Sequence, residues 1–145
     1  MPITMETDYA IRIVDCLARS EKKISAPKIA EKNKITVRFT LKILRKLVAS
    51  GIISSYKGIH GGYKVAVPPE KITLYDIFEV IEGAYEFSRC IDCDYICSKN
   101  ALSRCPYHYA FEEISHSVQS RLKSITVDDM IKKSNKCKSD SPQSL

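Results

Sequence analysis

The segment SAPKIAEKNKITVRFTLKILRKLVASG, at positions 25–51, decides the fold of this chain. Ser25 is a residue type that commonly caps a helix, and it predicts a short helix over 26–32. Thr36 can cap a longer helix over 37–50 in the same way, and apolar residues recur there at helical spacing. A short polar turn separates the two. The segment therefore predicts two helices joined by a tight turn.

The sequence on either side of this segment adds a consistent order of elements. An amphipathic helix is predicted over 7–20, because apolar residues recur there at spacings of three and four. Two β-prone runs, 52–56 and 63–67, flank the glycine-rich connector 57–62 and predict a hairpin. A capping pattern then predicts a helix over 74–82. This order is that of a winged helix-turn-helix, and the fold class expected is mainly α with a small β-hairpin.

The C-terminal half has a less regular pattern. A cysteine-rich irregular segment precedes a helix of about four turns, predicted over 109–123. A last short helix is expected to end at Ile131. Residues 132–145 have too few apolar side chains to pack, so disorder is expected there. We therefore expect a DNA-binding domain over 1–83 and a second segment, with the cysteines and the long helix, over 84–131.

The overall composition is that of an ordinary globular chain. The 145 residues are 44% apolar and 28% charged, values that fit neither a collagen-like nor a wholly disordered protein. No apolar run approaches the roughly 18 residues of a membrane span, and residues 1–8 lack the basic start and apolar run of a signal peptide. We therefore expect a cytoplasmic protein without a membrane partner.

Positive charge is concentrated in one part of the chain. Residues 21–64 hold 11 Lys and Arg against 2 Asp and Glu, a net charge of +9 in a chain whose total is +6. Such a block is typical of a surface that binds a polyanion, because neutralised phosphates release their condensed counterions. A solvated helix face is the alternative. Because the block coincides with the predicted winged helix-turn-helix, double-stranded DNA is the expected partner.

The second helix of the motif is expected to enter the major groove by its N-terminal end, while the wing contacts the backbone or the minor groove. Arg38 is the first choice for a base contact, since arginine can bridge guanine O6 and N7. His60, in the wing, could instead be an ordinary exposed loop side chain. The expected DNA-binding residues are Lys28, Thr36, Arg38, Thr40, Lys42, Arg45, Lys46, Lys57 and His60.

Four of the six cysteines lie in one short segment before the long helix: Cys90, Cys93, Cys97 and Cys105. A disulfide framework would spread its cysteines through the fold, and a reducing cytosol favours metal binding or redox chemistry. Thiolates at such spacing suit an iron–sulfur cluster or zinc, and the spacing alone does not separate the two. Cys16 lies on the packed side of the first helix and is expected to be a core residue.

Several short motifs stand together in this chain: TDYAIR at 7–12, IAEK at 29–32, FTLKIL at 39–44, KGIHGGY at 57–63 and ITLYDI at 72–77. With the cysteine segment, they resemble the Rrf2 family of bacterial transcription regulators. The similarity covers about residues 2–131. It implies a homodimer joined through the long helix, DNA-binding heads at either end, a pseudo-palindromic operator, and a cluster held by three cysteines and one other ligand.

The resemblance also implies a ligand set. Cys90, Cys97 and Cys105 match the family's three cysteines in order, and Cys93 is an additional thiol that could replace Cys97 or add to the set. For the non-cysteine ligand, His108 corresponds to the position used by IscR-like members. Asp8 corresponds to the position used by NsrR-like members, where it can come from the partner subunit. His108 is preferred here, and a 2Fe–2S cluster is favoured over a 4Fe–4S cluster.

These features together predict a DNA-binding transcriptional regulator that senses iron–sulfur status, redox or nitric oxide through a cysteine-ligated iron–sulfur cluster. Two alternatives stay open. One is a zinc- or thiol-dependent regulator of the same fold, and the other is an iron–sulfur carrier or assembly adaptor whose basic face docks an acidic protein. An enzyme is not expected, because no nucleophile elbow, phosphate-binding glycine loop or paired carboxylates occur in a recognisable catalytic setting.

Overall fold

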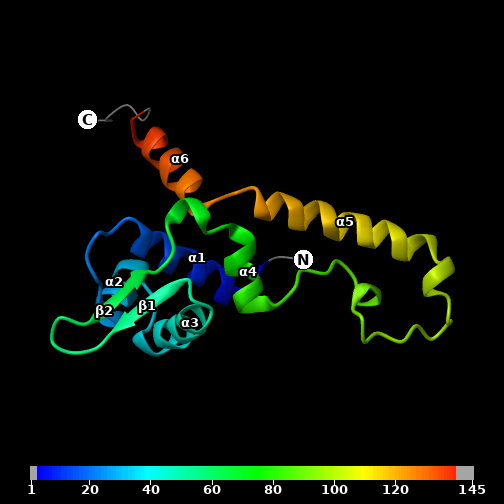
Figure 1. The fold of residues 1–145 in the computed structure, drawn as a ribbon, viewed down its shortest axis with the longest axis horizontal. Coiled ribbons are helices and arrows are strands. Elements are labelled where there is room, and N and C mark those ends of the chain that lie inside the picture. The colour runs from blue at the N-terminus through cyan, green and yellow to red at the C-terminus, as the bar shows by residue number, and fades with distance from the viewer. Residues whose placement is uncertain (1–2, 140–145) are drawn as a thin grey trace.

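The computed structural model describes residues 3–139 as a helical head with one long arm (Figure 1). In chain order the elements are α1 (Met5–Ala18), α2 (Ala26–Asn33), α3 (Val37–Ala49), β1 (Ile53–Tyr56), β2 (Gly62–Val65), the short 3-10 helix η1 (Pro69–Lys71), α4 (Leu74–Glu82), the 3-10 helices η2 (Arg89–Ile91) and η3 (Leu102–Arg104), α5 (Pro106–Lys123) and α6 (Val127–Ser139). This order confirms the expected fold class, mainly helical with one antiparallel hairpin. No helix among the described residues combines the length and the apolar composition that a membrane crossing requires.

Helices α1 to α4 and the hairpin form a head around one apolar core. The largest aliphatic side chains with almost no exposed surface are Ile13, Leu17, Ile29, Ile43, Leu44, Leu47, Ile53, Ile72 and Ile77. They come from every helix of the head, because each helix turns its apolar stripe inward. Burial of such side chains stabilises a fold by about 25 cal/mol per Å² of apolar surface. The inner face of α3 is therefore held firmly by the head.

The helix that follows the hairpin is capped at both ends. At the start of α4, the Asp76 N–H donates to Thr73 Oγ1 at 3.1 Å and the Thr73 N–H donates to Asp76 Oδ2 at 2.8 Å. This is a reciprocal capping box. At the other end Gly83 has a φ of 86°, a conformation that favours glycine. The helix predicted over 74–82 is confirmed.

The hairpin is joined to the segment before α2. Ile24 and Tyr63 exchange two backbone hydrogen bonds, of 3.0 and 2.8 Å. Gly62 stands at this crossing with a φ of 145°, and a Cβ there would lie 2.8 Å from the Ile24 carbonyl oxygen. A larger residue would push the two segments apart. The wing therefore has a fixed position relative to the helices of the head.

After α4 the chain runs outward and then comes back along α5 (Figure 1). We define the cysteine loop as residues 84–105, which lie on the other side of α4 from the hairpin. The chain rejoins the head where α6 begins, because the Leu74 N–H donates to Ile125 O and the Val127 N–H donates to Ile72 O, at 2.9 and 2.8 Å. The cysteine loop therefore lies between two attachments to the head.

Two boundaries differ from the sequence-based expectation. Helix α5 begins at Pro106, earlier than expected, because proline suits the first position of a helix; His108 therefore lies in its first turn. Helix α6 continues to Ser139, so the expectation of disorder is wrong for residues 132–139. Acidic residues in the first turn of α6 favour that helix. Residues 140–145 of the predicted tail lie outside the described residues.

Candidate functional site

Helix α3 presents one polar face away from the core. Its N-terminus is capped by Thr36, whose Oγ1 accepts a hydrogen bond from the Phe39 N–H at 3.3 Å. Arg38, Lys42 and Arg45 are exposed. Their spacings of four and three residues place them on one side of the helix. The structure thus brings four of the predicted DNA-contact residues to the exposed part of α3.

Thr40 does not join them. Its side chain is fully buried, and it shares the inner face of α3 with Ile43 and Leu47. Among the described residues its Oγ1 has no hydrogen-bond partner. The expectation that Thr40 faces DNA is wrong, because spacings of three and seven residues place it with the core.

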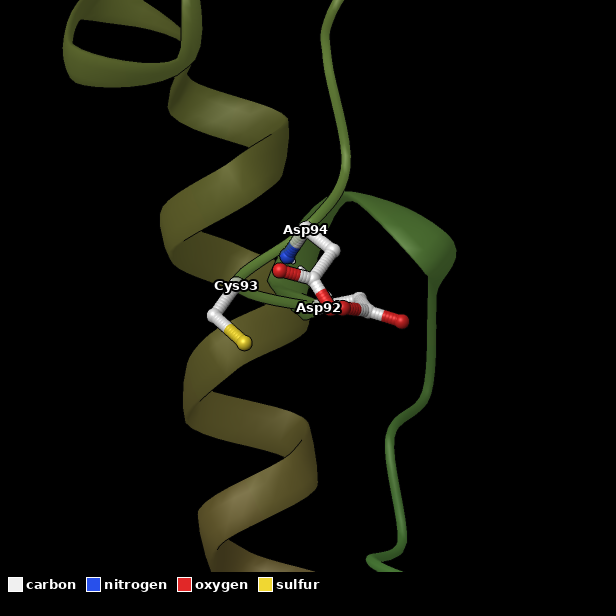
Figure 2. A group of neighbouring side chains, drawn as sticks. All are labelled: Asp92, Cys93 and Asp94. Carbon is white, nitrogen blue, oxygen red and sulfur yellow. Dashed lines mark hydrogen bonds between the residues drawn. The ribbon is translucent and has the colours of Figure 1, made fainter.

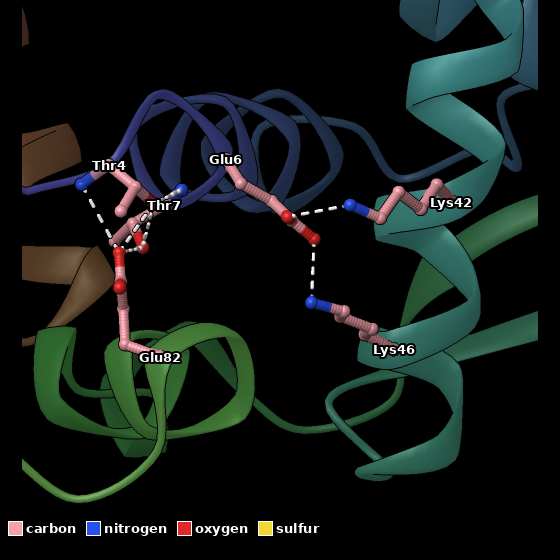
Figure 3. Close-up of polar contacts among 6 residues, drawn as sticks. All are labelled: Thr4, Glu6, Thr7, Lys42, Lys46 and Glu82. Atoms are coloured by element: carbon pink, nitrogen blue, oxygen red, sulfur yellow. Dashed lines mark hydrogen bonds and ion pairs between the residues drawn. The ribbon is translucent and has the colours of Figure 1, made fainter.

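Two lysines of α3 are paired with a carboxylate from α1. Lys42 Nζ lies 2.9 Å from Glu6 Oε2, and Lys46 Nζ lies 2.7 Å from Glu6 Oε1 (Figure 3). Hydrogen bonding to Lys46 and then to Lys42 lowers the pKa of Glu6, so the carboxylate is charged at neutral pH. The sequence alone does not point to Glu6, because 36 residues separate it from Lys42 and no spacing rule connects them.

A basic groove of about 590 Å³ lies between the segment before α2, α2 itself and the wing. Two predicted contact residues, Lys28 and His60, line it. Three further cations that the sequence analysis did not single out also line it: Lys22, Lys23 and Lys64. They belong to the basic block, but only the approach of the wing to α2 reveals that they face one groove. The groove therefore gathers cations of the segment before α2, of α2 and of the wing, together with Glu21.

The tip of the wing is a tight turn. The Gly61 N–H donates to the Gly58 carbonyl at 2.9 Å, and a Cβ on Gly61 would lie 2.4 Å from the Tyr56 carbonyl oxygen. Lys57 is exposed at this turn, and Ile59 is 100% exposed. The turn therefore presents one cation and one apolar side chain to the surroundings of the head.

The cysteine loop is attached to α5 by a few specific contacts. The Phe87 N–H donates to Ser115 Oγ at 2.8 Å, and Gln119 Nε2 donates to the Tyr85 carbonyl at 2.8 Å. The Phe87 and Phe111 rings lie 5.4 Å apart between centroids. Ser115 is the buried residue of α5, at 2% exposure. The sequence alone does not indicate its role, since an isolated serine in a helix carries no distinctive signal.

The thiols of the loop differ in exposure. Cys90, Cys97 and Cys105 are half-buried, whereas Cys93 is exposed. Among residues 3–139, no three ligand atoms from the predicted set of Cys90, Cys97, Cys105 and His108 lie within 4.8 Å of one another. The structure therefore places the predicted ligands in one region, the loop and the first turn of α5, without closing them around a single point.

A different group of potential ligands does come together in the loop. Asp92, Cys93 and Asp94 have ligand atoms within 4.8 Å of one another, and all three are exposed (Figure 2). The Asp94 N–H donates to Asp92 Oδ1 at 2.9 Å, so a local turn explains their proximity. Exposed acidic residues in a turn are common without a metal, and this group is not a metal site on its own.

The backbone around Cys97 favours its thiolate. Hydrogen bonds from the backbone of Ala101, Lys99 and Asn100 to the sulfur, aided by the Lys99 charge, lower the pKa of Cys97. Asn100 adopts a left-handed conformation with a φ of 50°, and its N–H donates to the Cys97 carbonyl at 2.9 Å, so a tight turn follows Cys97. Hydrogen bonds to cysteine sulfurs are a typical feature of iron–sulfur ligation.

The two candidates for the non-cysteine ligand have different surroundings. His108 lies in the first turn of α5, and its Nδ1 atom is buried without a hydrogen-bond partner among the described residues. Asp8 lies on α1 in the head and pairs with Arg12 at 2.7 Å. Figure 1 shows α1 and the cysteine loop on different sides of α4. Within one chain, only His108 is near the cysteines.

Comparison with known proteins assigns the fold to a family. Residues 3–133 match the family model of Rrf2, described as an iron-dependent transcriptional regulator. The chain belongs to the Rrf2 family. It is 32% identical over 124 residues to a protein of Aquifex aeolicus that is named among the HTH-type transcriptional regulators, covering 85% of this chain and 86% of that protein. It is also 31% identical over 94 residues to the transcriptional regulator NsrR of Shouchella clausii, covering 63% of each chain.

The solved structure of T. potens IscR superposes with a TM-score of 0.72 at 25% identity, covering 99% of this chain and 93% of that one. This likeness confirms the winged helix-turn-helix fold with C-terminal helices. As an Rrf2 protein, the chain is a DNA-binding transcriptional regulator, and not an enzyme.

Proposed function

We propose that this Rrf2 regulator senses iron–sulfur status, redox or nitric oxide through a cluster held by Cys90, Cys97, Cys105 and His108. The observation that carries the proposal is the buried, unpartnered Nδ1 atom of His108 at the start of α5, beside a loop with three half-buried thiols. A buried nitrogen without a partner is costly, and ligation would satisfy it. The backbone bonds to Cys97 support a thiolate in the same place.

Zinc and an iron–sulfur cluster place different requirements on these ligands. Four thiolate or imidazole ligands on one zinc ion would lie roughly 3.8 Å apart, as a Zn–S distance of about 2.3 Å and tetrahedral geometry require. No three of the four predicted ligand atoms in the described part of the chain lie within 4.8 Å of one another. A cluster binds its ligands through different iron atoms, so they need not converge on one point. The 2Fe–2S form stays the favoured nuclearity.

The cluster would supply a centre that oxygen, nitric oxide or iron scarcity can dismantle. The protein side of the response lies in the contacts already described. The loop is tied to α5 at Ser115 and Gln119, and it begins directly after α4, which packs in the head. Ligation of Cys90, in η2, and of Cys105, at the end of the loop, would hold the loop against α5. A coupling free energy of about 1–3 kcal/mol between ordering of the loop and DNA binding by the head would change operator affinity roughly 5- to 150-fold.

We further propose a homodimer joined through α5. Of the 18 residues of α5, only Ser115 is buried in the single chain. Tyr107 and Ile114, seven residues apart on one side of the helix, are 71% and 40% exposed. A second α5 would cover this stripe. A two-fold dimer would read a pseudo-palindromic operator with half-sites about 34 to 36 Å apart, or a multiple of that spacing.

The dimer can be tested by sedimentation equilibrium. Ile114→Glu should shift the protein toward monomer, because it places a charge in the apolar stripe. Glu113→Gln, a neighbouring change outside the stripe, is the matched control and should leave the mass unchanged. A parent protein that sediments as a monomer at micromolar concentration would contradict the dimer.

The cluster is tested by anaerobic purification followed by iron, sulfide and zinc analysis and visible absorption spectroscopy. The parent should carry iron and sulfide, and alanine variants of Cys90, Cys97 or Cys105 should lose both. Cys16→Ala and Cys137→Ala are the controls and should retain them. Colourless parent protein, zinc in place of iron, or equal operator affinity with and without the cluster would each overturn the proposal. Cys93→Ala tests whether the exposed thiol belongs to the set.

The role of α3 is tested separately with short duplexes. Arg38→Ala should relax preference at one operator position by about 1–3 kcal/mol. Arg45→Ala should instead weaken binding to all duplexes alike and make the dependence on salt shallower, because a phosphate contact carries no sequence information. Failure of both variants to change binding would remove α3 from the interface.

A further inference from the structure

Glu6 lies in the first turn of α1 and faces the recognition helix. Its two carboxylate oxygens contact Lys46 and Lys42 at 2.7 and 2.9 Å, one lysine per oxygen (Figure 3). The Glu6 side chain is 18% exposed, whereas the two lysine side chains are 37% and 55% exposed. A semi-buried acid thus lies beneath two surface cations on the face that also carries Arg38 and Arg45.

The first turn of α1 is itself fixed by a second carboxylate. Glu82 Oε1 accepts hydrogen bonds from the Thr4 N–H at 3.2 Å and from the hydroxyl groups of Thr4 and Thr7 (Figure 3). Thr7 is fully buried. Glu82 is the last residue of α4, and the cysteine loop begins two positions later. The place where the loop leaves the head therefore sets the position of Glu6.

This arrangement affects how strongly α3 can bind phosphates. The salt dependence of DNA binding counts the phosphates that a protein neutralises, with a slope of about −0.9 per phosphate. A lysine that is already neutralised by a carboxylate releases fewer counterions when it meets a phosphate. The carboxylate also repels the phosphate itself. Lys42 and Lys46 should therefore add less to DNA binding than two unpaired lysines would.

We propose that Glu6 is a positioning residue that holds Lys42 and Lys46 away from the DNA backbone, and that Glu82 keeps it in place. Glu6 thereby sets how many phosphates the recognition helix neutralises. The inference rests on the proposed contact between α3 and DNA, and it does not depend on the cluster. Its effect is present in cluster-free protein.

The test uses cluster-free full-length protein and a duplex of arbitrary sequence of about 30 base pairs, roughly three helical turns. Its affinity is measured by fluorescence anisotropy between about 50 and 200 mM salt. Glu6→Gln should bind roughly three- to tenfold more tightly near 0.1 M salt, with a slope steeper by about one to two. Glu70→Gln, on η1, makes the same change in net charge and should change neither quantity appreciably.

A second pair of variants tests the mechanism. Replacing both Lys42 and Lys46 by alanine should change the slope by less than about one in the parent, but by about two in the Glu6→Gln background. Thermal unfolding midpoints of all variants verify that they fold. A Glu6→Gln variant that binds no better than Glu70→Gln, or that binds more weakly, overturns the inference. If Arg45→Ala also leaves the slope unchanged, the proposed DNA contact of α3 has failed instead.

Discussion

The head and the cysteine loop are stabilised in different ways. Residues 3–83 hold nearly all of the apolar core, with fully buried side chains from α1, α2, α3, β1 and α4. Residues 84–105 contain no buried residue. The conformation of the loop depends instead on hydrogen bonds to α5, such as that from Phe87 to Ser115, and on the contact between the Phe87 and Phe111 rings.

The difference shows where a ligand can act in this molecule. Ordering one residue costs roughly 1–2 kcal/mol of backbone conformational entropy, and apolar burial offsets that cost in the head. The loop has little burial to offset it. A weakly stabilised loop beside a stable head is a region whose order a bound group can control without changing the fold. Four changes test this comparison.

The largest effect is expected from a truncation in the core of the head. Ile43→Ala should lower the free energy of unfolding by about 2–5 kcal/mol, because Ile43 is fully buried and the change leaves a cavity. Ile96→Ala in the loop is the matched control. Ile96 is 84% exposed, so its truncation should change the free energy by less than about 0.5 kcal/mol. Denaturant unfolding of cluster-free protein measures both, and similar losses in the two variants would contradict the comparison.

The next effect is expected from removal of the proposed cluster. A group whose free concentration is about 100 times its dissociation constant stabilises the region that it orders by about 2.7 kcal/mol. This lowers the equilibrium constant for local opening roughly one hundredfold. Proteolytic cleavage within 84–105 should therefore accelerate by up to about that factor when the cluster is stripped. The unfolding midpoint of the head should stay nearly constant. Equal cleavage rates with and without the cluster would show that the loop is ordered by its own contacts.

A smaller effect is expected at the hydrogen bond that ties the loop to α5. Ser115→Ala leaves the Phe87 N–H without its acceptor, at a cost of about 1–3 kcal/mol for the local order of the loop. Hydrogen exchange should become faster at Phe87 and its neighbours, and not at the core amides of α3. Ser117→Ala, an exposed serine on the same helix, is the control. If exchange at Phe87 is no faster in Ser115→Ala than in Ser117→Ala, Ser115 does not hold the loop.

The sequence predicted the head well, because local rules determine it. Capping residues and apolar spacing placed the helix over 74–82 at its observed bounds, and they placed Thr36 at the start of α3. The same spacing rule explains the failure at Thr40. Apolar spacing predicts which side of α3 is buried, but the buried side also includes Thr40, next to Ile43 and Leu47. Threonine has both a methyl and a hydroxyl group, so it can lie on the buried or on the exposed face of a helix. Only the packing of the head decides which face Thr40 takes.

The remaining features depend on contacts that are distant in sequence. Glu6 pairs with Lys42 across 36 residues. Glu82 contacts Thr4 and Thr7 across 78 and 75 residues. No local sequence pattern reports such separations. The polar composition of residues 132–139 suggested disorder, but an ion pair between Asp128 and Lys132, one turn apart, contributes to a helix there. In the loop, the cysteine spacing indicates metal chemistry. It does not indicate that Cys93 is exposed whereas the other three thiols are half-buried.

The smallest effect is expected in acid, and it belongs to the head. Hydrogen bonds from Thr4 and Thr7 lower the pKa of Glu82, and the paired lysines lower that of Glu6. A carboxyl whose pKa is lowered by folding stabilises the fold fully at a pH above its pKa in the unfolded chain, which is near 4.5. This stabilisation is lost as the pH falls through the lower pKa of the folded state. Because the groups reach solvent, each should contribute less than about 1 kcal/mol.

Thermal unfolding of cluster-free protein between about pH 5 and pH 3 measures this loss. Glu82→Gln and Glu6→Gln should each flatten the decline seen in the parent, because the amide does not titrate. Equal declines in the parent and both variants would mean that neither carboxylate stabilises the start of α1. Glu82 would then not hold the first turn of α1, and the cysteine loop would have no fixed connection, through α4 and Glu6, to the lysines of the recognition helix.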